Sequence, residues 1–346
     1  MDRELSVTLT QANDACSVAL DILRNKNDYN EAHLEPMKND LIDIQTDYKS
    51  ILALMYTHAT TLGIAFKPPS TPAGAIRPLK DLSTDISNLV GCVQCLRAGA
   101  HGKTLHREAT WRAQEIIEAV HALLQTFLAS KWDESPKQDK TYLMRIGALH
   151  SAIDFAKKDL SMDNTAAILS SWKSHSNTLA DALAECEELQ EESRRDSDGT
   201  IWGKRMTNDI AFVLLMCAVQ LRLIALIRLV SVLHQRVGAR HIVASLPNTV
   251  LDSILETSDA IGSAVDDLVS SLYAPQDLLA IKGELDGLEG AVASLQKLLN
   301  SSWEDELSQS MAAVSLERTD DASPSKDRAW LIMCFQQIKQ SIDAIR

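Results

Sequence analysis

The sequence predicts an all-α protein with two antiparallel helical bundles of about five to six helices each, joined by an acidic linker. Three observations lead to this class. The chain has 346 residues, the length of about two domains. Its 13 glycines and 9 prolines are fewer than a strand-rich fold with many tight turns needs. Apolar residues recur every three or four positions along most of the chain, which is the spacing of one helix face.

The first half of the chain predicts a series of helices separated by short gaps. A helix over 41–66 carries its apolar residues on one face and ends before Pro68 and Pro69, because proline lacks an amide hydrogen. Further helices are expected at 79–98, 105–131, 139–160 and 165–192.

A run of acidic residues at 185–198, closed by Gly199, separates the two halves. So many charges cannot be buried together, so the run is either a fraying helix end or a linker. The predicted domain boundary lies here. It gives an N-terminal bundle over 1–195 and a C-terminal bundle over 196–346.

The second half predicts helices at 201–237, 248–273, 275–300, 302–316 and 327–345, with a loop at 320–326. The ten apolar residues Ile210–Val219 are too few for a membrane span, which needs about 20. They predict the most buried helix of the bundle. Heptads over 248–300 favour a seam within the chain over an intermolecular zipper. Gly283, Gly287 and Gly290 predict a close approach between helices.

The charge balance limits the classes of partner. The chain has 34 basic and 47 acidic residues, a net charge of −13, of which −2 falls in 1–160 and −11 in 161–346. An acidic surface repels phosphate, so neither direct nucleic-acid binding nor membrane binding is expected. Six cysteines spread along the chain are typical of reduced thiols in a cytosolic or nuclear protein. The N-terminal residues lack the apolar core of a signal peptide.

Two motifs could carry redox or metal chemistry. Cys92 and Cys95 have redox-pair spacing but lie late in an apolar helix, which favours two core cysteines. Glu118 and His121 form half of a bundle di-iron motif, and no other histidine has a glutamate three residues before it. A bundle enzyme based on this pair is the least favoured hypothesis.

Two polar clusters could also form binding sites. His101, Lys103 and His106 could hold an anion, but a polar loop followed by a helix capped by Thr104 is favoured. Asp266 and Asp267 point about 100° apart on a helix, so they do not both face one metal easily. The alternative is that one is solvated and the other meets a cation across the bundle. No phosphate loop, zinc-protease motif or serine-hydrolase elbow is present. We therefore expect no enzyme activity, catalytic residue, cofactor or metal.

Two stretches are more distinctive than helix periodicity requires: YTHATTLGIAF at Tyr56–Phe66 and ETSDAIGSAVDDLVSSLYAP at Glu256–Pro275. Together they resemble the cyclin-D-binding protein family, also called Grap2- and cyclin-D-interacting protein or human homologue of Maid. The second stretch carries the family's Ser258-Asp259, its Val265–Leu268 and its Leu272–Pro275 ending. The segment at 96–120 fits the family more loosely. The first 35 residues and 135–195 show no match.

The resemblance implies an all-α, two-domain regulatory protein without enzyme activity. It implies binding of D-type cyclins and helix-loop-helix transcription factors, and restraint of the cell cycle and of transcription in nucleus and cytoplasm. Because the chain lacks a basic arm, such a protein could sequester a partner in a complex unable to grip DNA.

We expect partner binding at a helical groove whose acidic surroundings steer basic partners. The residues nominated for this role are Asp259, Asp266, Asp267 and Tyr273. The alternative function is a structural helix-bundle adaptor of the cytoskeletal or junctional kind, suggested by the long helices and short loops.

Overall fold

A computed structural model describes residues 3–25, 40–67, 71–129, 141–198, 209–242, 246–273, 278–312 and 324–346. All regular structure within these ranges is helical, and none of these residues forms a strand. The predicted all-α class is therefore confirmed.

The chain divides into two compact units, Met1–Ala167 and Ile168–Arg346. The division lies within helix α7 (Asn164–Asp198), upstream of the predicted boundary at 195. The acidic run is helical as far as Asp198, so its described part is a helix end. Trp172, on an earlier turn, and Cys186, within the acidic run, are both buried in the core of unit 2. The run therefore lies on a helix that already belongs to the second unit.

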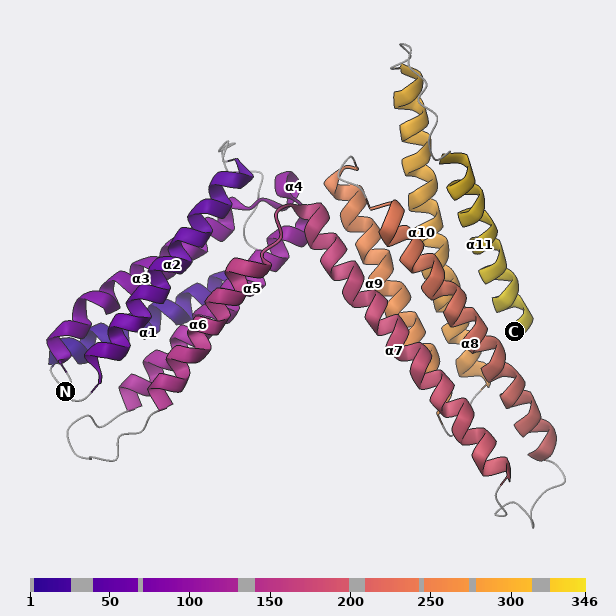
Figure 1. Ribbon diagram of the computed structural model, residues 1–346, viewed down its shortest axis with the longest axis horizontal. Helices are drawn as coiled ribbons and strands as arrows, with labels where there is room; N and C mark the ends of the chain where they lie inside the picture. The colour runs from indigo at the N-terminus through magenta and orange to yellow at the C-terminus, as the bar shows by residue number, and fades with distance from the viewer. Residues whose placement is uncertain are drawn as a thin grey trace. The chain divides into compact units, whose positions relative to one another are not determined.

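Unit 1 has five long helices in its described part, α1 (Arg3–Arg24), α2 (Leu41–Ala65), α3 (Pro72–Cys95), α5 (Lys103–Ala129) and α6 (Thr141–Asp159), with the one-turn helix α4 (Ala98–His101). They lie side by side (Figure 1), and the contacts follow the closed order α1–α3–α2–α6–α5–α1. One core fills this ring. Near one end of the core Phe66 stacks on Phe127, with ring centroids 4.1 Å apart. Tyr48, near the start of α2, is also fully buried and lies against Ala109 of α5.

Helix α1 was not predicted from the sequence, although its apolar residues have the required spacing. Leu5, Leu9, Ala12, Cys16 and Leu23 are buried against the rest of unit 1. Small residues at two of these positions make the apolar stripe weak, so the pattern is less clear than in α2.

Helix ends in unit 1 follow local chemistry at some points and tertiary contacts at others. The side chain of Asp40 caps α2, and Pro72 begins α3, where no amide hydrogen is needed. The start of α3 therefore precedes the predicted residue 79, and Pro78 lies inside the helix.

The start of α5 depends on a tertiary contact. Gly102, just before this helix, has φ +96°. The side chain of Asn164 accepts a hydrogen bond from Leu105 N–H at 3.0 Å.

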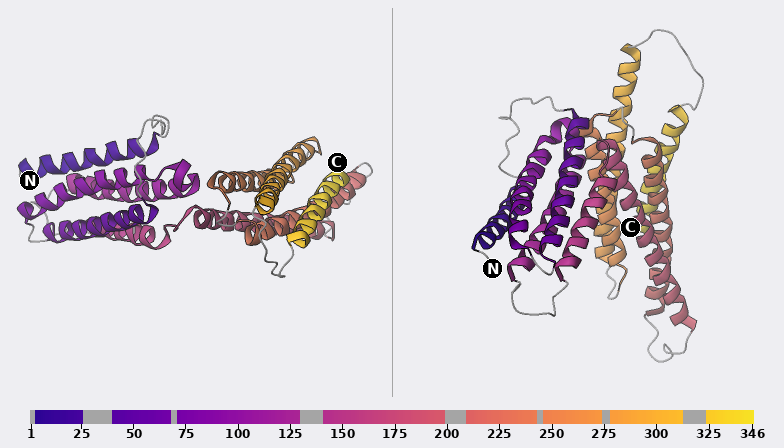
Figure 2. Two further views of the ribbon diagram at one scale, coloured as in Figure 1. Left: turned by 90° about the horizontal axis from the view of Figure 1, so that it is seen from above. Right: turned by 60° about the vertical axis from the view of Figure 1, so that its left-hand side comes forward.

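Unit 2 contains α7, α8 (Asp209–Arg240), α9 (Asn248–Ser270), α10 (Leu278–Ala312) and α11 (Pro324–Ile345) in its described part. Backbone contacts link α8 to α11, α11 to α10, and α10 to α9 (Figure 2), while side chains of α7 reach both α8 and α9. Its core consists mainly of aliphatic side chains.

Two predicted boundaries in unit 2 were wrong. Helix α10 is continuous through residues 301–302, where two separate helices were expected. The Ser301 hydroxyl donates to the Leu298 carbonyl within the helix and so does not interrupt it. Helix α11 begins at Pro324, inside the predicted loop 320–326. Proline is favourable at a first helical position, where the structure needs no amide hydrogen.

Helix α8 contains the most apolar stretch of the described chain. Ala218–Arg240 is long and apolar enough to cross a membrane by length and composition alone, and 50 % of its most apolar window is buried inside the unit. Core helices have the same composition, and Leu223, Ile227 and Val230 are buried here. Side chains of Ile210–Cys217, in the stretch predicted as the most buried helix, lie outside the described residues.

Candidate functional site

The four residues nominated from the sequence lie on or just after α9, but they do not form one surface patch. Asp259 Oδ1 lies 3.7 Å from His175 Nε2 on α7. Tyr273 Oη donates a 2.5 Å hydrogen bond to Glu185, also on α7. Asp267 instead lines a groove between α9 and α10. The predicted patch is therefore divided between two sides of α9.

Asp266 lies in an acidic neighbourhood on the same helix. Its pKa is raised by burial and, to a lesser extent, by the nearby carboxylates of Asp267 and Glu185. The predicted cation across the bundle is thus replaced by like charge at this position. The Tyr273 hydroxyl donates to the same Glu185, which offsets part of the repulsion between α7 and α9.

Next to Asp259, Ser258 joins three helices through a buried polar network. Its side chain is fully buried. Ser258 Oγ lies 2.8 Å from His175 Nδ1 on α7 and 2.7 Å from His234 Nε2 on α8. His234 also stacks on Trp172 with ring centroids 4.1 Å apart, and the Trp172 indole donates to the His234 carbonyl.

The direction of each hydrogen bond in this network follows from counting protons. Ser176 Oγ donates its single hydrogen to the carbonyl of Trp172, so it must accept from His234 Nδ1–H, 3.0 Å away. Burial, with a smaller effect of His175, lowers the pKa of His234 to about 3 and keeps this ring neutral. His234 Nε2 therefore accepts from the Ser258 hydroxyl, and Ser258 Oγ accepts from His175 Nδ1–H.

This serine, histidine and aspartate combination is not suited to catalysis. A nucleophilic serine must reach a substrate, and Ser258 has 0 % of its surface exposed. Its hydroxyl is also used to satisfy both histidine rings. The network instead holds α7, α8 and α9 together and explains why a serine stands at this position.

A groove between α9 and α10 lies beside the predicted residues. Its walls consist mostly of small side chains, and its lining residues are Ser253, Glu256, Thr257, Ala260, Ser263, Ala264, Asp267, Glu284, Gly287, Gly290, Ala291, Ser294 and Leu298. None of these described lining residues is basic. A Cβ placed on Gly283, Gly287 or Gly290 meets no atom within 4 Å. The predicted close helix approach at these glycines was therefore wrong, because they face open space.

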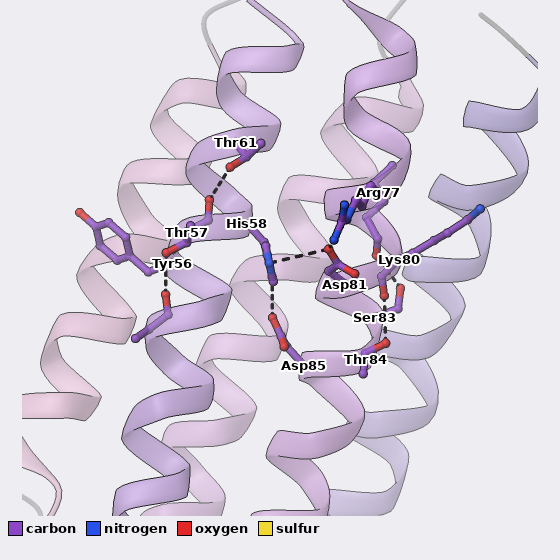
Figure 3. Close-up of polar contacts among 12 residues, drawn as sticks. Tyr56, Thr57, His58, Thr61, Arg77, Lys80, Asp81, Ser83, Thr84 and Asp85 are labelled. Carbon is purple, nitrogen blue, oxygen red and sulfur yellow. Dashed lines mark hydrogen bonds and ion pairs between the residues drawn. The ribbon is translucent and has the colours of Figure 1, made fainter.

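Unit 1 has a separate polar cluster between α2 and α3, which Figure 3 shows. His58 Nδ1 lies 2.7 Å from Asp85 Oδ2, and His58 Nε2 lies 4.0 Å from Asp81, which also pairs with Arg77. Burial raises the pKa of Asp85, and its hydrogen bond to His58 opposes that rise. Both ring nitrogens face carboxylates, so the cluster joins α2 to α3.

The motifs considered for redox chemistry and an anion site take structural roles. Burial raises the pKa of Cys92 to about 12, and its thiol donates to Ile44 O, so it lacks the low pKa of a redox cysteine. His101 Nδ1 accepts from Arg97 N–H within the turn. The helix after this turn begins at Lys103, so Thr104 lies inside it. The predicted Thr104 cap was wrong: the side chain of Asn164 meets this helix end from 59 residues away.

The half-motif considered for metal binding is also used within unit 1. Glu118 pairs with Arg24 at 2.6 Å, and His121 contacts Gln125. Among all described residues, no group of three or more potential ligands could hold a metal ion.

The sequence did not predict the network around Trp172, His175 and His234, because its members come from three helices. Ser258 and Asp259 stood out only as part of a distinctive block. The groove had a local signal, since small residues recur at helical spacing in both α9 and α10.

The fold and these clusters define the class of protein. It is all-helical in its described part, and its described polar clusters hold helices together. The acidic groove between α9 and α10 remains open. Residues 47–192 match the family described as Grap2 and cyclin-D-interacting, N-terminal. This match confirms the resemblance to the Grap2 and cyclin-D-interacting protein family over 47–192, which is less than half of the chain. A comparison with curated proteins finds no match.

The family match covers more of the first half of the chain than the resemblance did, and it does not test the resemblance in the second half. It includes Tyr56–Phe66, and it also spans most of 135–195, where the sequence showed no resemblance. The second block, Glu256–Pro275, lies outside the matched residues. The match also crosses the division between the units at Ala167.

Proposed function

We propose that the protein is a non-enzymatic adaptor that sequesters regulators of the cell cycle or of transcription by binding them through helical surfaces. The partners are D-type cyclins, and helix-loop-helix transcription factors as a second group. The family match carries this proposal, because the family is described by its interactions with cyclin D and Grap2. We further propose that the protein acts in both nucleus and cytoplasm.

The chemistry of the described residues supports a binding role. Its potential nucleophile Ser258 is fully buried, and Cys92 is a buried thiol with a raised pKa. The exterior of 161–346 carries most of the chain's net charge of −13. An acidic exterior attracts basic protein segments and repels phosphate, which favours protein partners over direct nucleic-acid contact.

Sequestration has a simple electrostatic form in this proposal. A helix-loop-helix partner grips DNA through basic residues, which neutralise phosphates. The acidic chain competes for those residues and supplies no basic arm of its own. The resulting complex would hold a transcription factor in a state with weak DNA affinity.

Affinity capture tests the proposal. The purified full chain is immobilised and offered a purified D-type cyclin at low and high salt, about 0.05 M and 0.5 M, because exposed charge pairs are screened over this range. We expect capture that weakens with salt. Failure to retain the cyclin at either salt concentration would overturn the cyclin part of the proposal.

A gel-shift assay tests the transcription-factor part. The full chain should reduce DNA binding by a purified helix-loop-helix dimer in proportion to its concentration. An unchanged shift at saturating chain would overturn this part. Cell fractionation separates the proposal from a cytoskeletal or junctional adaptor: filament or membrane association favours the latter, and a diffuse nuclear and cytoplasmic distribution favours the former.

A further inference from the structure

We propose that the groove between α9 and α10 is the docking site for a basic amphipathic helix of a protein partner. The proposal rests on the adaptor function above and assigns one of its binding surfaces. Four observations carry it: the open groove, its small-residue walls, the acidic groups at both ends and the uncovered positions of Gly287 and Gly290.

The shape of the groove suits a helix. Its lining residues on α9 run from Ser253 to Asp267, a stretch of 15 residues whose ends are about 21 Å apart at a rise of about 1.5 Å per residue. This length equals about four turns of a partner helix. Ala260, Ala264 and Ala291 leave room for the partner's backbone to come close, as small residues do at tightly packed helix pairs.

The charges of the groove determine the chemistry of the occupant. Glu256 lies toward one end, while Asp267 and Glu284 lie toward the other, near the connection from α9 to α10. Glu256 and Asp267 are 11 residues apart, or about 16 Å along the helix axis. A partner helix matches them with basic residues at positions i and i+11, which lie on the same face at about 100° per residue.

Two other occupants fit less well. A second copy of this chain docking through the same groove would bring like carboxylates together at both ends, which is unfavourable. A bound metal ion is disfavoured because the described residues form no cluster of three potential ligands. A basic helix satisfies both the shape and the charge.

A defined peptide probes the groove directly. The probe is a fluorescent, capped helical peptide of about 18 residues, long enough to populate a helix, with arginines at positions 4 and 15 and alanine or leucine between them on the same face. A second peptide replaces both arginines with glutamate. Fluorescence anisotropy with the intact chain measures the affinity of each.

Matched glycine variants test the location. Gly290→Leu places a bulky side chain in the groove, whereas Gly147→Leu adds the same group on α6 of unit 1, and both positions have open space for a Cβ. We expect Gly290→Leu and the glutamate peptide each to weaken binding by about tenfold or more. Gly147→Leu should stay within about twofold, with circular dichroism showing equal helix content.

Each result has a defined meaning. Equal affinity of the two peptides, or an unchanged affinity in Gly290→Leu, overturns the docking site. If Gly290→Leu loses the peptide but still retains D-type cyclin, the groove binds basic helices and the cyclin uses another surface. If the unaltered chain binds the peptide but no cyclin, the cyclin proposal fails while the groove assignment stands.

Discussion

Replacing Ser258 with alanine measures how much the polar network stabilises unit 2. Ser258 Oγ is 2.7 Å from His234 Nε2 and 2.8 Å from His175 Nδ1, and both contacts are lost in Ser258→Ala. The side chain of His175 is 23 % exposed, so water can replace its partner. His234 is 1 % exposed, so its Nε2 acceptor stays buried and unsatisfied.

The magnitude follows from that single orphaned acceptor. A buried neutral polar group without a partner costs about 1–3 kcal/mol, and we take about 2 kcal/mol. With a urea dependence of about 2 kcal/mol per molar, the unfolding midpoint of unit 2 should fall by about 1 M. Tryptophan fluorescence follows this transition, because Trp172 stacks directly on His234.

A serine on the exposed side of α7 provides the control. Ser174→Ala should change the free energy of unfolding by no more than about 0.5 kcal/mol. If the midpoint of Ser258→Ala remains within the shift of this control, the serine hydroxyl does not stabilise the three-helix contact, and the assigned direction of the hydrogen bonds loses its support.

Three further predictions concern other contacts. Folding lowers the pKa of His234 from 6.5 to about 3, so its contribution to the free energy of unfolding is fully present above pH 6.5 and is lost as pH falls toward 3, by about 1.4 kcal/mol per pH unit. His234→Gln should therefore make the urea midpoint less dependent on pH. An unchanged dependence of the midpoint on pH would contradict this. Gly238→Ala should destabilise the protein by about 1–3 kcal/mol, because its Cβ would lie 2.5 Å from Trp172 Nε1. Gly287→Ala should stabilise it by about 0.5–1 kcal/mol, because the added Cβ meets open space and alanine favours a helix. Thermal unfolding compares the two, and a stability change of the same sign in both variants would refute the packing argument. Asn164→Ala should cost about 1 kcal/mol and speed amide exchange at the start of α5, and unaltered exchange there would show that the cap is dispensable.

Much of the fold could be predicted from local patterns. The ends of α2, α6 and α9 lie close to their expected positions, because apolar spacing and nearby breakers are properties of short segments. The errors also have local causes. Helix α1 has a weak stripe with small residues, and α10 continues through 301–302, where the Ser301 hydroxyl bonds within the helix.

The candidate site was only partly predictable. Asp267 lines the groove between α9 and α10, whereas Asp259 and Tyr273 are directed toward α7. Residues on one helix can be assigned to a common face from their spacing. Which neighbouring helix covers that face cannot be assigned from spacing alone.

Amphipathic periodicity was enough to predict a helical protein, and the acidic composition argued against nucleic-acid partners, because both depend only on which residues are present and how far apart they stand. Tertiary packing decided which polar groups are buried and which remain open. Ser258 and His175 are 83 residues apart, and Leu105 and Asn164 are 59 apart. Such pairs meet only after the helices pack, so the buried network and the acidic groove were visible only in the folded chain.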